Sequence, residues 1–432
     1  MKHNFMKPLQ AITLSGVIAL ASAHAGIYSE ATGDNTNAFD APVAGFVGPD
    51  GEGKARLDNG SDGFDNENNY INPIFFDWAD VVTSYTRADG QSGFSNPSLA
   101  LGEVTGNNFD VVSLGDLTSS QITNGDPAGS LTLEFLNPIS NFSGADFVIY
   151  ENGFLASGTS NVFAELAYVE VSDDGINFLR FESVSDTSSA VGAFSAIDST
   201  DIFNLAGKHA NAFGESWGTP FDIAELGLSQ ISHIRLVDIP GDGSFTDAGG
   251  DPIYDPWQTF GSGGADIEAV GSISTAMTFS NWPQLQNITN AADRDPDDDP
   301  DGDGYTNLEE YAFAMLPWQN DSGAAPLKLE LVNQGGTLAA EFLFPRDERL
   351  SDLTYEIWVS NDLSNWNLMA TSTAGQPLQK DPAFSTATVT DTSSSENQSI
   401  GVLRQVRIRD TASVQSEPKR FFRVIISQTP MP

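Results

Sequence analysis

The sequence predicts a mainly β protein in which two β-sandwich domains flank a short helical calcium-binding module. Three observations lead to this prediction. Short runs rich in Val, Ile, Phe and Tyr alternate with clusters of Gly, Asn, Asp and Ser along most of the chain, a pattern typical of sandwiches and jelly rolls. An acidic segment around residue 300 has the spacing of a calcium-binding loop. The chain has no cysteine, so its stability must come from packed cores and bound metal rather than from disulfides.

The first 25 residues have the pattern of a secretory signal peptide. Lys2 and Lys7 give a basic start, residues 11–21 are apolar, and residues 23–25 read Ala-His-Ala, which is a small-residue cleavage site. The apolar run is well short of the ~18 residues that a transmembrane helix needs. We therefore expect a mature chain from about Gly26 that is secreted, or held at the cell surface by partners, without insertion into a membrane.

The strand pattern divides the rest of the chain. A jelly-roll-like sandwich is expected over residues 26–275, with strands at 130–136, 146–150, 167–172, 178–183, 231–239 and 267–273. A smaller immunoglobulin- or fibronectin-like sandwich is expected over residues 326–428, with strands at 327–332, 338–344, 354–359, 402–409 and 420–426. Residues 429–432 form a short tail.

Residues 276–325 are predicted to contain a calcium loop of the EF-hand type. A hard cation needs roughly six to eight oxygen ligands, and the spacing between Asp299 and Glu310 wraps them around one point. A start at residue 297 would put Leu308 at the last ligand position, and a start at residue 295 would put Pro300 at the sharp turn. The expected calcium ligands are Asp299, Asp301, Asp303, the carbonyl of Tyr305, Asn307 and Glu310, with Gly304 at the turn. The alternative is a solvated acidic linker without metal.

Short helices are expected on both sides of this loop. Before it, Pro283 suits a first helical turn, with Leu285, Ile288 and Ala292 on one face. After it, Leu308, Tyr311, Ala312 and Met315 form one apolar stripe that Pro317 ends. Because only one loop is present, we expect a structural staple between two β domains, binding calcium at ~10⁻⁴ to 10⁻³ M, rather than a sensor.

The net charge of −40 lies almost entirely before residue 326. Such a surface repels nucleic acid and anionic lipid, so neither is an expected partner. An acidic surface of this kind favours the binding of cations, and it is also typical of proteins from a salty habitat. Carboxylates at strand ends also allow a second calcium site, formed where neighbouring strands bring their oxygens together. Its candidate ligands are Glu151, Asn152, Asp255, Asp266 and Glu268.

Aromatic residues in Gly- and Pro-rich surroundings allow a ligand platform, because exposed rings stack on sugars and other flat molecules. The candidates are Trp217, Tyr254, Trp257 and Phe260, and the alternative is that these rings cap the sandwich core. No catalytic residue is assigned. His209 and His233 are both better explained as structural, and no nucleophile elbow, phosphate loop or zinc motif is present. Paired carboxylates do allow glycosidase chemistry, with candidates at Glu151, Glu165, Glu170, Asp255, Asp266 and Glu268.

Two similar segments occur in the two β domains. Ser172 to Phe178 and Ser360 to Trp366 each place an Asx-rich turn between a strand and an aromatic residue. Independent use of the same hairpin chemistry explains this similarity better than a repeat does.

About half of the chain resembles a family of exported bacterial cell surface proteins. The matching stretches are NYINPIF (69–75), ALGEVTG (100–106), VSLGDL (112–117), GADFVIYENGF (144–154), AELAYVEVSDDG (164–175), NLAGKHAN (204–211), WGTPFD (217–222), ISHIRLVDIPG (231–241), PIYDPW (252–257) and GSGGADIEAVG (261–271). This resemblance implies a galactose-binding-like jelly roll but no activity. The calcium loop, a thrombospondin-type-3-like segment, and the following sandwich with RFFRV (420–424) resemble C-terminal modules of exported bacterial proteins. Many relatives carry an envelope-sorting tail that we do not find after Val424.

These observations favour a calcium-binding, non-enzymatic binding or adhesion protein outside the cell or on its surface, with a carbohydrate or other small ligand. One alternative is a hydrolase of surface polysaccharide. Another is a scavenger of a cobalamin-like ligand that works beside an outer-membrane transporter, which would make an envelope protein its partner. The sequence does not name the ligand.

Overall fold

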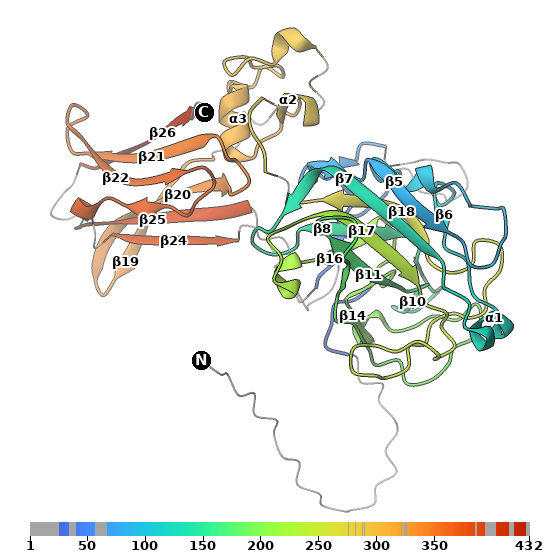
Figure 1. Cartoon of the computed structure of the whole chain (residues 1–432). Coiled ribbons are helices and arrows are strands. Elements are labelled where there is room, and N and C mark those ends of the chain that lie inside the picture. The colour runs from blue at the N-terminus through green and yellow to red at the C-terminus, as the bar shows by residue number, and fades with distance from the viewer. Residues whose placement is uncertain are drawn as a thin grey trace, which may run out of the picture.

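The computed structural model describes residues 26–33, 40–56, 67–274, 276–280, 282–286, 288, 290–320, 322–323, 326–384, 387–393, 403–413 and 419–428. The expected signal peptide and the tail at 429–432 lie outside these residues. As predicted, the fold is mainly β, and it has two lobes with a helical module above their junction (Figure 1). No helix in the described part of the chain is long and apolar enough to cross a membrane.

The N-terminal lobe contains two antiparallel six-stranded sheets. The first has the strand order β1 (Val43–Ala44), β16 (Trp217–Phe221), β8 (Phe147–Glu151), β18 (Asp266–Ser272), β4 (Asp77–Trp78), with β6 (Val112–Ser113) also on β18. The second has the order β12 (Leu179–Arg180), β11 (Ala167–Ser172), β17 (Gln230–Asp238), β7 (Ser130–Ser140), β5 (Val81–Thr86), with β15 (Leu205–Ala206) on β11.

The main core of this lobe includes residues from both sheets, such as Leu131 and Leu133 of β7 and Phe147 and Ile149 of β8. Residues two apart on a strand lie on the same face of the sheet, so these side chains all point into one core, while Val148 and Tyr150 on the other face of β8 pack in a second cluster. The predicted strands around residues 130, 146, 167, 231 and 267 are therefore confirmed, with ends shifted by a few residues. Shorter elements complete the lobe: the pairs β2 (Phe46–Val47) with β3 (Tyr70–Ile71), β9 (Phe154–Leu155) with β10 (Val162–Phe163), and β13 (Val184–Ser185) with β14 (Ile202–Phe203), the helix α1 (Ser119–Asn124), and 3₁₀ turns at Pro97–Ala100, Ser199–Asp201 and Ile223–Leu226.

The C-terminal lobe has two four-stranded antiparallel sheets. One has the order β19 (Lys328–Gln334), β20 (Thr337–Asp347), β25 (Leu403–Ser413), β24 (Thr388–Ser393). The other has the order β23 (Gln379–Lys380), β22 (Trp366–Thr373), β21 (Leu353–Ser360), β26 (Phe421–Gln428), and a 3₁₀ turn lies at Pro382–Phe384. The five strands predicted here are all present. Three further strands, β22, β23 and β24, were not predicted; β23 has only two residues, and β22 and β24 interrupt their apolar residues with Ser, Thr, Asn and Asp.

The helical module consists of α2 (Trp282–Leu285), a 3₁₀ turn at Ala291–Asp293 and α3 (Asn307–Phe313). It shares one hydrophobic core with the C-terminal sandwich, since Tyr311 and Ala312 of α3 pack in the same cluster as Tyr355 of β21. The Tyr355 hydroxyl donates a 2.6 Å hydrogen bond to the carbonyl of Ala312, and the Tyr311 hydroxyl donates a 2.8 Å bond to Asp352. The module is thus part of the second lobe's core rather than a loose connection.

Arg349 joins the two lobes. Its Nη1 donates hydrogen bonds of 2.6 and 2.8 Å to the carbonyls of Ile74 and Ile273 in the N-terminal lobe. Its guanidinium also lies 3.4 Å above the ring of Phe76, which belongs to the hydrophobic cluster of the C-terminal lobe. These contacts hold the lobes against each other.

The two similar hairpins make the same hydrogen bonds. In the first, Asp174 Oδ1 accepts bonds of 2.9 and 2.8 Å from the backbone of Ile176 and Asn177, and Ser172 Oγ accepts a 3.0 Å bond from Gly175. In the second, Asp362 Oδ1 and Ser360 Oγ accept the corresponding bonds at 2.8, 2.7 and 2.9 Å. The pattern Ser-x-Asp-x-x-Asn is therefore a local turn device, in accord with independent hairpin chemistry.

Candidate functional site

The predicted calcium loop brings three carboxylates together. Oxygen atoms of Asp299, Asp301 and Asp303 all lie within 4.8 Å of one another. This spread is about twice the ~2.4 Å length of a calcium–oxygen bond, so one ion can contact all three. Asp301 Oδ2 is buried and accepts no hydrogen bond among the described residues. The loop is therefore shaped to hold a cation rather than to be an extended acidic linker.

Backbone N–H groups hold these aspartates in place. Asp299 Oδ1 accepts a 2.9 Å bond from Gly302, and Asp299 Oδ2 accepts a 3.0 Å bond from Gly304. Asp303 Oδ1 accepts a 2.8 Å bond from Tyr305, the residue whose carbonyl is the predicted ligand at loop position 7. Gly304 has a φ of +100°, which residues with a side chain rarely adopt, as the sharp turn predicted at this position requires.

Helix α3 begins inside the loop and carries its last two predicted ligands. Thr306 caps the helix through a reciprocal pair of bonds with Glu309. Asn307 donates bonds of 2.8 and 2.9 Å to the carbonyls of Asp293 and Asp295, which fastens the entry of the loop to its exit. Asn307 Oδ1 is buried and accepts no bond among the described residues, and Glu310 is fully buried in the first turn of α3.

Two details differ from the EF-hand expectation. The carboxylate of Glu310 is not part of the group of three aspartates within 4.8 Å. The short helix expected at Pro283 is present as α2, but it ends at Leu285, so a 3₁₀ turn at 291–293 directly precedes the loop and Ala292 is exposed rather than on an apolar face. The unit is thus a loop followed by a helix.

The electrostatics of the loop favour a divalent cation. Burial, and next the charge of Asp303, raise the pKa of Asp301. A bound cation would remove this repulsion, and oxygen donors with net negative charge are what calcium prefers. The donors that fit the ion are Asp299, Asp301 and Asp303, with Asn307 and Glu310 at the base of α3.

Within the described part of the chain, the residues considered for a second calcium site do not bring three carboxylates within 4.8 Å of one another. Glu268 Oε1 accepts bonds of 2.7, 2.9 and 2.7 Å from Thr105 N, Thr105 Oγ1 and Gly106 N, and Glu268 Oε2 accepts a 2.6 Å bond from Asn211. Asp255 accepts a 2.8 Å bond from the backbone of Leu166. These oxygens therefore serve as hydrogen-bond acceptors for backbone and side-chain groups of other segments.

The remaining three candidates, Glu151, Asn152 and Asp266, lie close to one another, and each takes part in hydrogen bonds to the backbone. The backbone N–H of Asp266 donates a 3.0 Å bond to Glu151, and the side chain of Asn152 donates to the carbonyl of Asn108 at 3.4 Å. Outside the Asp299 loop, the described residues contain no group of three carboxylate, histidine or cysteine ligand atoms within 4.8 Å.

A set of buried carboxylates instead anchors the start of strand β18. The successive N–H groups of Gly264, Ala265 and Asp266 donate to Glu165, Asp238 and Glu151 at 3.0, 2.8 and 3.0 Å. Burial is the main cause that raises the pKa values of all three acceptors well above their usual range. Sequence reasoning did not identify this set, because its members lie on strands and loops far apart in the chain.

The predicted aromatic platform is not present as a surface. Trp217 is only 7% exposed, which corrects its assignment as an exposed ring. Gly33 and Gly53 pack against it so closely that a Cβ at Gly53 would lie 2.0 Å from the indole. Tyr254 and Trp257 are half-buried, and the Trp257 indole donates to the carbonyl of Leu117 at 3.1 Å. Phe260 alone of the four is well exposed.

The histidines have structural surroundings. His209 is buried, and burial, followed by the charge of Lys208, lowers its pKa well below the usual value. His233 lies opposite Glu134 in the pairing of β17 with β7, and its Nδ1 is 2.9 Å from Ser232 Oγ. Because that hydroxyl also bonds to the carbonyl of Asp173 at 2.7 Å, it serves to hold the neighbouring hairpin.

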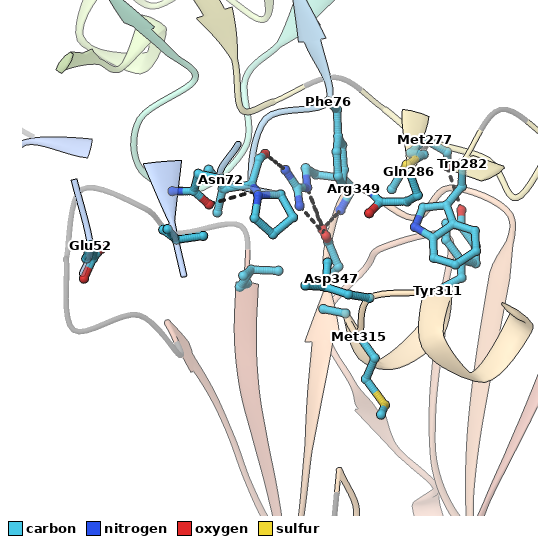
Figure 2. A pocket seen from close by; sticks show the side chains of 16 residues that line it. Glu52, Asn72, Phe76, Met277, Trp282, Gln286, Tyr311, Met315, Asp347 and Arg349 are labelled. Atoms are coloured by element: carbon cyan, nitrogen blue, oxygen red, sulfur yellow. Dashed lines mark hydrogen bonds and ion pairs between the residues drawn. The ribbon is translucent and has the colours of Figure 1, made fainter. Parts of the chain in front are cut away.

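A pocket at the junction of the lobes was missed by sequence reasoning. It has a volume of about 450 Å³ and is lined by residues of both lobes and of the helical module, including Phe76, Trp282 and Arg349 (Figure 2). Its walls come from six separate parts of the chain, so no local motif signals it. Comparison of the chain with models of known protein families and with curated proteins gave no match.

Proposed function

We propose that this chain is an exported, non-enzymatic calcium-binding protein that acts outside the cell or on its surface, and whose bound ion stabilises the module between two β-sandwich lobes. The observation that carries this proposal is the convergence of Asp299, Asp301 and Asp303 oxygens within 4.8 Å. Export rests on the signal-peptide pattern of residues 1–25.

The position of α3 supports a structural role for the ion. Asn307 and Glu310 belong to the predicted ligand set, while Tyr311 and Ala312 of the same helix pack in the core of the C-terminal lobe. An ion that orders the loop therefore also stabilises the start of a core helix. Ligands that bind only the folded state stabilise it by mass action.

Binding fits the rest of the molecule better than catalysis does. Hydrolysis of a polysaccharide needs two accessible carboxyl groups. The six carboxylates considered for this role are all less than one-tenth exposed: Glu151, Glu165, Glu170, Asp255, Asp266 and Glu268. Glu170, for example, is engaged by Arg180 at 2.7 Å and by Arg235 at 2.5 Å.

Calcium titration of the mature protein tests this proposal. We expect calcium to raise the free energy of unfolding by about 1–3 kcal/mol at ten to a hundred times the dissociation constant. Calorimetric melts in calcium, magnesium and chelator would measure this gain. Glu310→Gln should abolish most of it, because it removes a charged ligand from position 12.

A matched control is Asp297→Asn, which removes one negative charge beside the loop without touching a ligand position. It should keep the calcium-dependent gain. Identical melts of the wild-type protein in calcium and in chelator would contradict a structural role for calcium.

A further inference from the structure

The pocket between the lobes has the dimensions of a small-molecule site. Its volume of about 450 Å³ lies within the range of roughly 300–1,000 Å³ that ligand pockets occupy, and such pockets are frequent at domain junctions. The N-terminal lobe contributes Phe76, the helical module contributes Trp282 and Gln286, and the C-terminal lobe contributes Asp347 and Arg349 (Figure 2).

The charges in this pocket cancel. Arg349 and Asp347 form an ion pair of 2.6 Å in which both side chains are almost fully buried. The remaining Nη1 hydrogens of Arg349 are used by the carbonyls of Ile74 and Ile273. The only other charged residue of the lining is the exposed carboxylate of Glu52, on a protein with a net charge of −40. An anionic ligand is therefore disfavoured.

The walls are aromatic and adaptable. Phe76, Trp282 and Tyr311 present rings, and Met277 and Met315 present flexible thioethers that make favourable contacts with aromatic groups. Trp282 and Tyr311 are fixed against each other with ring centroids 5.5 Å apart. Rings together with flexible methionines suit a flat apolar molecule.

Two polar side chains of this wall are available to a ligand. Gln286 is 7% exposed and Trp282 is 3% exposed, and neither side chain is among the buried polar groups without a partner, so the Gln286 carboxamide and the Trp282 indole N–H reach the solvent of the pocket. In Figure 2 the Gln286 carboxamide is turned toward the Arg349–Asp347 pair at the centre of the pocket. A ligand with a matching hydrogen-bonding group can take the place of solvent at this carboxamide.

We propose that this pocket binds a small, uncharged aromatic molecule that carries one hydrogen-bonding group, with Gln286 as its polar contact. The inference deepens the binding function proposed above by giving it a site. It differs from the expected aromatic platform, because its rings belong to the junction of the lobes and not to the loops around residues 217 and 254–260.

Fluorescence titration with N-phenyl-1-naphthylamine, a neutral aromatic amine, tests the proposal on the full mature chain in calcium. We expect saturable binding at one site. Met315→Trp fills the pocket and should weaken binding at least tenfold. The anionic dye 8-anilino-1-naphthalenesulfonate should bind at least tenfold more weakly than the neutral amine. Phe194→Ala, which removes an exposed ring of the N-terminal lobe, should change nothing.

The polar contact is tested with 1-benzylnaphthalene, in which a CH₂ group replaces the N–H of the amine. Gln286→Leu should weaken binding of the amine by about two- to tenfold, as loss of one hydrogen bond predicts, and leave the hydrocarbon unaffected. This comparison tests the hydrogen bond between Gln286 and the amine even if the Met315→Trp variant does not fold. Unsaturable dye binding, or equal binding of the amine to wild type and Gln286→Leu, would overturn the proposal.

The calcium proposal and the pocket proposal can be refuted independently of each other. Calcium binding is measured by calorimetry without dye, and dye binding is measured at a single saturating calcium concentration. A protein that binds calcium and no dye would keep the structural role of the ion and refute the pocket as a ligand site.

Discussion

The acidic loop of the module and the acidic strand ends of the N-terminal lobe contain the same side chains in opposite arrangements. In the loop, oxygens of Asp299, Asp301 and Asp303 face one another within 4.8 Å. In the N-terminal lobe, Glu268 and Asp255 each accept hydrogen bonds from backbone groups of other segments. Both regions allowed a calcium site in the sequence, and among the described residues only the loop brings three carboxylates within 4.8 Å of one another.

The difference teaches that convergence, and not the number of carboxylates, distinguishes a metal site from a structural acid. A cation binds where like charges are held close at a cost that the ion relieves. Glu268 and Asp255 belong to no group of three ligand atoms within 4.8 Å in the described part of the chain, and their hydrogen bonds compensate their burial. The predictions below separate the two kinds of acid, beginning with the largest effect.

Removal of Glu268 should destabilise the protein strongly and without regard to calcium. Glu268→Ala leaves the buried N–H groups of Thr105 and Gly106 and the amide of Asn211 without an acceptor. We expect a loss of about 3 kcal/mol or more in the free energy of unfolding, the sum of a few unsatisfied buried groups. Urea unfolding in calcium and in chelator should give the same loss.

Glu268→Gln is the control, because it keeps an acceptor oxygen for the two backbone groups and should lose less. A loss that appears only in calcium would mean that Glu268 binds the ion and that the contrast between the two regions is false.

The stability of the protein in chelator and the additional stability from calcium should change with pH in opposite directions. Burial raises the pKa of Asp146 to about 7 and that of Asp116 to about 6. The folded state therefore binds more protons than the unfolded state between about pH 4 and 7, and stability in chelator should fall as pH rises through this window. The additional stability from calcium should instead grow with pH, since its ligands must be deprotonated.

Melting temperatures at pH 5, 6, 7 and 8, with calcium and with chelator, would measure both slopes. Asp146→Asn should flatten the slope in chelator, because it removes one of the titrating groups. A melting temperature in chelator that rises from pH 5 to 8 would contradict the assignment of these acids as buried structural groups.

The smallest expected effect concerns the twin hairpins, one in each lobe. Gly175 and Leu363 occupy the same position, with φ values of +69° and +64°. A side chain at this conformation costs energy that glycine avoids, partly offset by the larger entropy of glycine in the unfolded chain. Leu363→Gly should therefore raise the free energy of unfolding by less than about 1 kcal/mol. A urea titration that shows a clear loss would mean that the leucine contributes packing that its 57% exposure does not suggest.

Features that are formed by one continuous segment of the chain could be predicted from the sequence. The loop from Asp299 to Glu310 is one segment, and β7 and β17 are long runs with a clear apolar pattern, so both were located correctly in the chain. Trp217 was misjudged because its glycine neighbours in space, Gly33 and Gly53, lie far away in the sequence. The pocket was not predictable for the same reason, since Phe76, Gln286 and Arg349 meet only after both lobes have folded.

Phe76 has a consequence for how such a chain can evolve. It belongs to the N-terminal lobe but packs in the hydrophobic cluster of the other lobe, under the guanidinium of Arg349. If a gene fusion moved the N-terminal lobe alone to a new protein, Phe76 would lose its packing partners. If it moved the C-terminal lobe alone, Arg349 would lose its two carbonyl acceptors. Recombination that exchanges both sides of this contact together should therefore be tolerated better than recombination that separates them.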